Sequence, residues 1–301
     1  MAADTAMSPY LSALESEAIQ IIRDGVAEAR NPVVLFSAGK DSTVLAHLVM
    51  RAFYPSKPPV PLLHVDSTWE FTELMQFRDD FAKEHGFDLV VYANEEGRAQ
   101  GINPFDHDSL YTTMMRTDAL KQALDEGGYD IIFGGARRDE EATRAKERVA
   151  SVRSEGHVWD PRRQRPELWN TYNWRLSPKE TMRAYPISNW TEDDLWSYIK
   201  AQNIQLAPLY YAAPRPVVER DGALIVVDDQ NRMRWKDGEQ AQTKTVRFRT
   251  LGCWPVTAAV ESDAATVADV MLENTATKSS ERRGRVSDDG SLEMQKRNGY
   301  F

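Results

Sequence analysis

Apolar positions in the first two-thirds of the chain follow two different periods. Short apolar runs predict buried strands at residues 33–36, 60–65, 88–92 and 129–133. Between them, apolar residues three or four positions apart predict helices at residues 11–29, 73–85, 112–124 and 192–202, with a further helix directly after the first strand. Strands that alternate with helices form parallel βαβ units. The pattern therefore predicts an α/β fold with a doubly wound, mainly parallel sheet.

The pattern changes near residue 205, which predicts a domain of residues 1–205 and a smaller C-terminal region, residues 206–301. In the second part, residues 215–228 predict a strand pair that turns at Asp221-Gly222. Residues 244–250 alternate apolar residues with Arg247 and Arg249, which predicts an edge strand with one basic face in solvent.

Two further features close the chain. Residues 267–272 predict a last helix. The basic tail at residues 281–285 is expected either to fold over a bound phosphate chain or to remain mobile.

A short polar turn separates the first predicted strand from the helix after it. Its residues are Ser37, Ala38, Gly39, Lys40, Asp41 and Ser42. Small residues that open a helix present free backbone N–H groups at the positive end of the helix dipole, and Lys40 adds a full charge. The turn therefore predicts a binding site for a chain of phosphates. The alternative is a strand, turn and helix that bind no ligand.

The motif in this turn distinguishes between classes of phosphate loop. A Walker A motif is excluded because Asp41 follows Lys40 and Val34 stands at the first glycine position. A dinucleotide fingerprint is excluded because only one glycine is present. The string SAGKDS instead resembles SGGKDS, the pyrophosphate loop of the adenine nucleotide α-hydrolase (PP-loop) superfamily. That resemblance implies cleavage of ATP between its α- and β-phosphates, although Ala38 replaces a glycine with a residue of less backbone freedom.

Polar residues also follow two other predicted strands. Asp66 ends the strand at residues 60–65, and Gly134-Gly135 end the strand at residues 129–133. Ligands of such sheets lie beyond the carboxyl ends of the strands, so we expect these residues to share one site with the polar turn. Asp66 has two interpretations: a ligand of Mg²⁺ or of ribose hydroxyls, or a cap on the next helix.

A basic segment begins directly after the glycine pair. Residues 137–165 hold nine Lys and Arg against six Asp and Glu, in a chain of net charge −9. Gly135 lets the backbone approach a ligand closely, and the planar forks of Arg137 and Arg138 suit sulfate or phosphate. Alternatively, Glu140 and Arg144 pair at helical spacing on a solvated face.

Composition excludes several functional classes. The chain has 301 residues and a net charge of −9, which argues against a general nucleic-acid or membrane-surface binder. Cys253 is the single cysteine, so the chain has no disulfide framework, cysteine metal cluster or CxxC redox pair, and burial as a small apolar residue is expected. No signal peptide and no membrane-spanning run is visible, and a cytoplasmic location is predicted.

The resemblance to a known family extends over nearly the whole chain. The strings LLHVDSTWEF, GGARRDEEATRAKER, WDPRRQRPELWN, SNWTEDDLW, RPVVERDG, VRFRTLGCWP, AVES and ERRGR occur in this order and resemble the small subunit of bacterial sulfate adenylyltransferase. The resemblance implies that ATP and sulfate react to adenosine 5′-phosphosulfate and pyrophosphate, with Mg²⁺ and a GTPase large subunit as partner. The chain departs from the family pattern at three places. Ser67-Thr68 stands where Thr-Gly is usual, Ala258 stands where glycine is usual, and residues 174–179 replace a stretch that contains glycine.

These observations assign a role to each candidate residue. The residues of the polar turn, with Lys40, are expected to bind the β- and γ-phosphates of ATP beside Mg²⁺. Arg137 and Arg138 are expected to hold sulfate or the α-phosphate, and Asp66 to orient the metal or the nucleoside. The sequence shows no Ser–His or Cys–His arrangement that would indicate covalent catalysis. Because sulfate is a poor nucleophile, the reaction instead requires that sulfate be positioned against the α-phosphorus.

Other classes remain as alternatives. A sulfonucleotide reductase on the same fold would use a cysteine near the C-terminus, and none follows Cys253. A tRNA-thiolating relative would need paired cysteines. A catalytically weakened or retargeted paralogue could serve as a regulatory subunit, because several departures lie near the proposed nucleotide site.

Overall fold

A six-stranded sheet forms the centre of the computed structural model, which describes residues 7–140 and 144–276. Its strand order is β3-β2-β1-β4-β6-β5. The strands are β1 (Pro32–Leu35), β2 (Leu62–Val65), β3 (Leu89–Tyr92), β4 (Ile131–Phe133), β5 (Ala150–Arg153) and β6 (Thr181–Ala184). Five strands are parallel, and β5 runs antiparallel to β6 at one edge. The predicted α/β class and mainly parallel sheet are confirmed.

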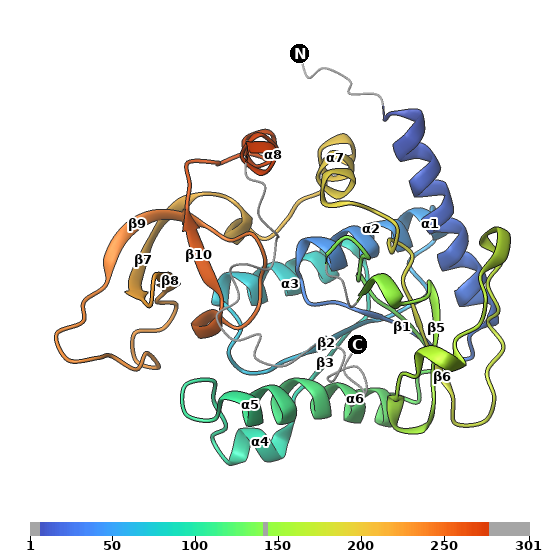
Figure 1. The fold of residues 1–301 in the computed structure, drawn as a ribbon, viewed down its shortest axis with the longest axis horizontal. Helices are drawn as coiled ribbons and strands as arrows, with labels where there is room; N and C mark the ends of the chain where they lie inside the picture. The colour runs from blue at the N-terminus through green and yellow to red at the C-terminus, as the bar shows by residue number, and fades with distance from the viewer. Residues whose placement is uncertain (1–6, 141–143, 277–301) are drawn as a thin grey trace.

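Helices cover both faces of this sheet (Figure 1). One face carries α1 (Pro9–Glu28), α2 (Lys40–Phe53), α3 (Thr72–His85) and α7 (Glu192–Gln202), and the other carries α6 (Ala119–Gly127). Alternate residues of β1 divide between the two layers. Val34 belongs to the larger apolar cluster, whereas Val33 and Leu35 pack with Leu120 and Leu124 of α6. This alternation is why β1 is apolar on both sides.

Helix boundaries follow local capping signals. Thr191 and Asp194 form a capping box at the start of α7. The helix predicted at residues 112–124 is divided, since Thr112–Asp118 form a π-helix that continues into α6. Short helices α4 (Glu95–Ala99) and α5 (Asp108–Tyr111) precede it.

Two strands of the sheet, β5 and β6, were not predicted by the apolar pattern. Both contain buried charged or polar residues, including Arg153 and Arg183, each 1% exposed. Arg153 donates to Glu147 at 2.7 Å, so its charge is paired inside the protein. Because buried ion pairs look polar in sequence, they hide the alternation that identifies a strand.

The C-terminal part contains a closed barrel of four antiparallel strands in the order β10-β8-β7-β9. The strands are β7 (Ala213–Arg220), β8 (Ala223–Val226), β9 (Gln242–Arg247) and β10 (Ala258–Glu261), and α8 (Val267–Ala276) follows. The predicted hairpin is confirmed: Asp221 and Gly222 connect β7 to β8, and both have positive φ, at 52° and 77°.

The prediction of an exposed edge strand at residues 244–250 is wrong. The strand β9 pairs with β7 on one side and with β10 on the other. Arg247 is 1% exposed, and its guanidinium donates at 2.6 Å to Glu273 of α8. The arginine therefore attaches α8 to the barrel instead of facing water.

The barrel and the sheet share one continuous apolar cluster. Phe71, at the start of α3, packs on Phe248 with ring centroids 4.8 Å apart. The division at residue 205 stays a prediction, and the basic tail lies outside the described residues. No helix in the described part of the chain is long and apolar enough to cross a membrane.

Candidate active site

The strand order shows where successive strands are added on opposite sides of β1. From β1, the chain proceeds through β2 to β3 on one side, and β4 and β6 lie on the other. The switch point is therefore between β1 and β4, where doubly wound sheets bind their ligands. The polar turn after β1 and the glycine pair after β4 both lie there, as predicted.

Hydroxyl groups organise the polar turn. Gly39 is the N-cap of α2, and its carbonyl accepts hydrogen bonds from Ser42 Oγ at 3.0 Å and Thr43 Oγ1 at 2.9 Å. The Oγ atoms of Ser37 and Ser42 are 3.2 Å apart across the turn. The turn thus combines helix N–H groups with hydroxyl donors, the chemistry that a phosphate chain requires.

Ala38 adopts a conformation that usually belongs to glycine. Its φ is +58°, and its side chain is fully buried. An alanine in this left-handed region carries a steric cost of about 1 kcal/mol. The turn therefore keeps a backbone conformation that suits glycine, and the methyl group of Ala38 should lower the free energy of unfolding.

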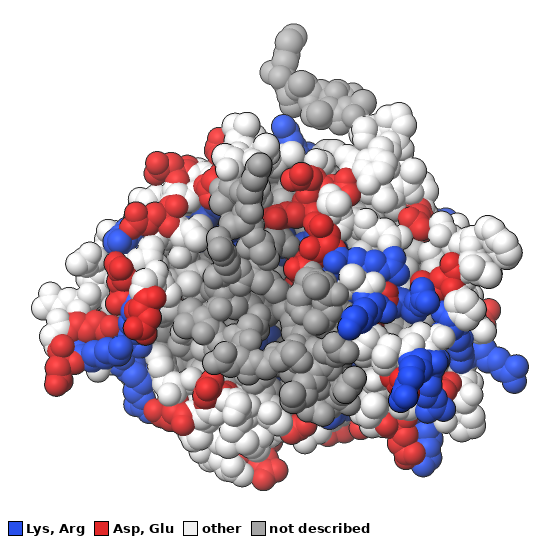
Figure 2. All heavy atoms as spheres, viewed as in Figure 1, with Lys and Arg blue, Asp and Glu red and all other residues white. Residues whose placement is uncertain are grey.

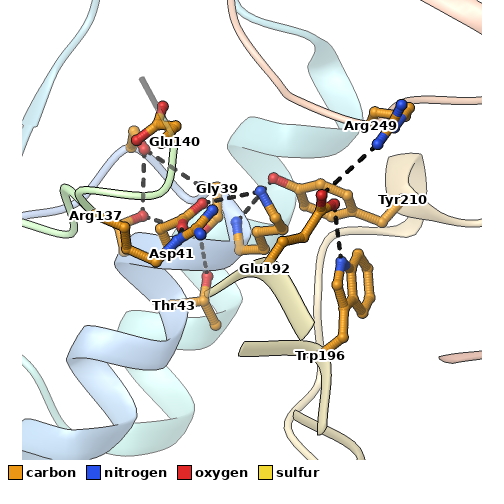
Figure 3. Close-up of polar contacts among 12 residues, drawn as sticks. Gly39, Asp41, Thr43, Arg137, Glu140, Glu192, Trp196, Tyr210 and Arg249 are labelled. Atoms are coloured by element: carbon orange, nitrogen blue, oxygen red, sulfur yellow. Dashed lines mark hydrogen bonds and ion pairs between the residues drawn. The ribbon is translucent and has the colours of Figure 1, made fainter. Parts of the chain in front are cut away.

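Asp41 connects two cations at the start of α2 (Figure 3). Its Oδ2 is 3.1 Å from Nζ of Lys40, and its Oδ1 accepts from Nε of Arg137 at 2.6 Å. Burial opposes ionisation of Asp41, but the charges of Lys40 and Arg137 prevail and hold its pKa well below the usual range. The carboxylate is therefore ionised at neutral pH and fixes both cations beside the turn.

Gly135 brings the loop after β4 into contact with the turn. A Cβ atom at this position would lie 3.0 Å from the carbonyl carbon of Asp41 and 3.1 Å from the backbone nitrogen of Ser42. Only a residue without a side chain fits without displacing that backbone. The two loops at the switch point consequently touch through their main chains.

Tyr210 reaches the turn from the C-terminal part of the chain (Figure 3). Its hydroxyl accepts a hydrogen bond from the backbone nitrogen of Lys40 at 2.8 Å. Nearby, Glu192 at the start of α7 lies 3.6 Å from a guanidinium nitrogen of Arg249. Neither Tyr210 nor Glu192 was predicted from the sequence, because neither belongs to a local motif and only the fold brings Tyr210 to the turn and Glu192 to Arg249.

Comparison with known proteins identifies the family. Residues 31–259 match the family described as "Phosphoadenosine phosphosulfate reductase domain". Sulfate adenylyltransferase subunit 2 of Geotalea uraniireducens (strain Rf4) is 58% identical over 97% of this chain and 98% of its own length. The same subunit of Acinetobacter baumannii (strain AYE) is 58% identical over 97% of both chains.

The chain belongs to the sulfate adenylyltransferase subunit 2 family. The name of these relatives implies at least one further subunit. Among solved structures, FMN adenylyltransferase of Candida glabrata covers 95% of this chain and 93% of its own, with a TM-score of 0.50 and 13% sequence identity. At this identity the likeness concerns the fold alone.

The single cysteine of this chain, Cys253, is unsuited to redox chemistry. Cys253 is buried, and its thiol lies 2.8 Å from the hydroxyl of Tyr111 and 3.2 Å from Oγ of Ser67. Burial raises the pKa of the Cys253 thiol. Because a thiolate is the reactive form, the environment keeps this cysteine inert, which agrees with its interpretation as a small buried residue.

Two residues that the sequence predicts in the site, Arg138 and Asp66, make their contacts outside the polar turn. Arg138 does not turn toward the polar turn, since its guanidinium contacts the carbonyl of Glu147 at 3.1 Å and the amide oxygen of Asn189. Asp66 accepts a hydrogen bond from the backbone nitrogen of Thr68 at 2.7 Å, and it also lines a cavity of about 770 Å³. The predicted helix cap at Asp66 is wrong, because α3 begins at Thr72 with Phe71 as its N-cap and the bond to Thr68 is confined to a turn.

Proposed function

We propose that this chain transfers the adenylyl group of ATP to sulfate, which gives adenosine 5′-phosphosulfate and pyrophosphate, the first step of sulfate activation. The observation that carries this proposal is 58% identity, over 97% of the chain, to proteins named sulfate adenylyltransferase subunit 2. A sulfate oxygen attacks the α-phosphorus and forms the S–O–P bridge. The bond from the α-phosphorus to the oxygen of the β-phosphate breaks, and pyrophosphate leaves.

Positioning and charge neutralisation suffice for this reaction. Sulfate is a weak nucleophile, so the protein must hold it in line with the α-phosphorus and stabilise the leaving pyrophosphate. We assign the β- and γ-phosphates to Ser37, Ala38, Gly39, Lys40, Asp41 and Ser42. In this assignment backbone N–H groups and hydroxyls bind phosphate oxygens, and Lys40 supplies the full positive charge. Arg137 keeps Asp41 ionised and the loop ordered, and Gly135 allows the close approach.

The fit of Mg²⁺ follows from the carboxylates that are present. In the described part of the chain, no three His, Cys, Asp or Glu side chains gather to hold a metal ion. Mg²⁺ that arrives with a triphosphate needs only one or two protein carboxylates. Asp66 is the carboxylate that the sequence predicts for this role, and it lines a cavity that no residue of the polar turn lines. When bound, the ion would neutralise charge on the phosphates.

We propose a GTPase large subunit as the partner of this chain. We also propose a cytoplasmic location. The sulfate–phosphate anhydride is less stable than the anhydride of ATP that it replaces, so the reaction needs an additional driving force. This chain has no GTP-binding motif of its own, since Gly39-Lys40 lacks the Walker A context. Coupling to GTP hydrolysis would therefore reside on the other subunit.

Substitution of Lys40 tests the proposal. Lys40→Ala is expected to abolish sulfate-dependent pyrophosphate release while the urea unfolding transition remains cooperative. Lys57→Ala, at an exposed position outside the site, is the matched control and is expected to retain activity. Turnover by Lys40→Ala equal to that of the control would remove Lys40 from the mechanism.

A second candidate function is a weakened subunit that binds ATP and regulates its partner. It is favoured by Ala38 and Thr68, both near the site and both with positive φ, at 58° and 68°. This candidate predicts ATP binding without pyrophosphate release in the presence of sulfate and the partner subunit.

A further inference from the structure

The segment between β5 and β6, residues 154–180, presents two large apolar side chains to solvent. This exposed pair is Trp169, which is 92% exposed, and Leu168, which is 59% exposed. Six of the eight tryptophans of the chain are buried, so exposure on this scale is an exception. Tryptophan is also among the residue types that contribute most to binding at the centre of protein interfaces. The exposed pair therefore suits contact with another protein.

The backbone holds the exposed tryptophan in an uncommon conformation. Trp169 has φ 55° and ψ 36°, and the next residue, Asn170, has φ 54°. This left-handed region is sterically unfavourable for a bulky side chain. Such a conformation persists only where the surrounding structure fixes it, and it occurs preferentially at sites that contact a ligand or a partner.

Hydrogen bonds to the sheet fix the segment around the exposed pair. Glu167 accepts from the backbone nitrogen of Ala150 at 2.8 Å. The amide of Gln164 accepts from the backbone nitrogen of Val152 at 2.9 Å and donates to its carbonyl at 3.0 Å. Both contacts are made to β5, which is an edge strand of the sheet. The exposed pair is thus held on an ordered frame, and an ordered surface loses less entropy when it binds.

A polar cavity of about 380 Å³ adjoins the exposed pair. Glu167 and Asn170, the residues on either side of the pair, both line it. Arg138 and Arg148 line the same cavity, and Arg148 is exposed. An apolar anchor and guanidinium groups therefore lie side by side on one surface, and guanidinium groups form strong hydrogen bonds with carboxylates.

The charge of this region differs from that of the whole chain. Residues 161–179 hold five Lys and Arg against one Glu, although the net charge of the chain is −9. Figure 2 shows Lys and Arg side chains gathered on the right of the view, near β5 and β6. A partner with acidic side chains complements such a surface. A second copy that met the same surface about a twofold axis would bring like charges together, which argues against a homodimer here.

From this arrangement we propose that the exposed pair and the adjoining cavity form the contact surface for the partner subunit. Acidic side chains of the partner enter the cavity, and Trp169 inserts into an apolar pocket of the partner. The proposal rests on the proposed function, because that function includes a second subunit. The surface also adjoins the loop after β4: Arg138 lines the cavity, and Arg137 before it donates to Asp41 at 2.6 Å. Contact with the partner therefore acts on the loop that holds the polar turn.

Calorimetric titration of the purified chain with the purified GTPase large subunit tests the apolar part of the surface. Trp169→Ala is expected to raise the Kd about thirtyfold or more, as for removal of a central tryptophan from an interface. Trp235→Ala is the matched control, because Trp235 is 42% exposed and lies between β8 and β9, outside this surface. Its Kd should stay within about twofold of wild type, and both variants should unfold cooperatively in urea.

Charge reversal tests the cavity separately. Arg148→Glu is expected to raise the Kd about tenfold at low ionic strength. The difference from wild type should shrink at high ionic strength, because salt screens interactions between exposed charges. Lys57→Glu makes the same change of charge at an exposed position outside the surface and is expected to leave the Kd unchanged.

Three outcomes would overturn this surface: an unchanged Kd in Trp169→Ala, a rise of equal size in Trp235→Ala, and no binding of the wild-type chain, which would also contradict the proposed partner. Sedimentation that shows a dimer of this chain alone, dissociated by Trp169→Ala, would assign the surface to a second copy instead. Failure of the proposed function has a different signature. In that case the complex forms and depends on Trp169, but it releases no pyrophosphate from ATP in the presence of sulfate.

Discussion

The side chain of Arg137 donates from Nε to Oδ1 of Asp41 at 2.6 Å and thereby joins the loop after β4 to the first turn of α2. The other oxygen of Asp41 is 3.1 Å from Nζ of Lys40. One carboxylate thus sets the positions of two cations that come from neighbouring strands of the sheet. This contact holds the polar turn after β1 against the loop after β4.

Removal of the Asp41 charge should destabilise the fold. Asp41→Asn removes the carboxylate that lies 2.6 Å from Arg137, a side chain that is 0% exposed, and the expected loss in the free energy of unfolding is about 3 kcal/mol. Urea denaturation measures it. Asp139→Asn is the control, because Asp139 is 51% exposed and 3.9 Å from Arg137, and a loss below about 0.5 kcal/mol is expected. Equal losses in the two variants would contradict this account.

Glycine substitutions should distinguish two strained positions. Ala38 and Thr68 have φ of +58° and +68°, and a β-branched residue tolerates this region less well than alanine. Thr68→Gly is therefore expected to raise the free energy of unfolding by more than Ala38→Gly does. Both gains should be at most about 1 kcal/mol, because glycine also increases the entropy of the unfolded chain. The reverse order in urea unfolding would show that φ does not govern these positions.

A methyl group at Gly135 should disturb nucleotide binding. In Gly135→Ala the new Cβ meets the main chain of Asp41 and Ser42 at 3.0–3.1 Å, so the phosphate loop must shift. The expected result is a rise of about tenfold in the KM for ATP, because a displacement of the order of 1 Å costs about a hundredfold in substrate positioning and the shift here is smaller. Gly134→Ala, whose Cβ meets only the ring of Tyr185 at 3.1 Å, should have a smaller effect. A larger effect at Gly134 would argue against main-chain contact as the cause.

The stability of the protein should fall between pH 7 and 5.5 chiefly because of His47 and His64, and burial also lowers the pKa of His157. Burial, and then the charge of Arg78, lowers the pKa of His64 to about 4, and burial, then Arg51, does the same for His47. In the unfolded chain these groups have a pKa near 6.5, so the unfolded state takes up protons that the folded state refuses as the pH falls. Each group then contributes a slope of up to about 1.4 kcal/mol per pH unit.

His64→Gln should reduce this slope. His64 is 3% exposed, and its Nδ1 lies 2.8 Å from the carbonyl of Phe36, directly before the phosphate loop. Urea unfolding at pH 7, 6 and 5.5 is expected to show a smaller loss of stability per pH unit in the variant than in the wild type. An identical pH dependence in wild type and variant would show that His64 does not cause it.

The sheet and the phosphate loop could be predicted because their signals are local. Apolar runs such as β1 and β2 are bounded by polar turns, and the small residues from Ser37 to Ser42 open a helix. The strand–helix alternation then placed this loop and the glycine pair at one end of the sheet. The structure adds the positive φ of Ala38, which a single sequence cannot give.

The missed parts depend on long-range pairing. The strands β5 and β6 bury Arg153 and Arg183, and β9 buries Arg247 against Glu273, so residues that look solvent-exposed in sequence lie in the interior. Tyr210 reaches the phosphate loop only through the folding of the C-terminal part onto the sheet. Such partners are distant in sequence, and no local period encodes them.

The most direct test of the central claim is sulfate-dependent release of pyrophosphate from ATP. It is measured for this chain with its partner subunit, with and without GTP, and with sulfate omitted as the control. Release that requires sulfate and rises with GTP is expected. No release under any condition, while ATP still binds, would contradict adenylyl transfer and favour the regulatory subunit.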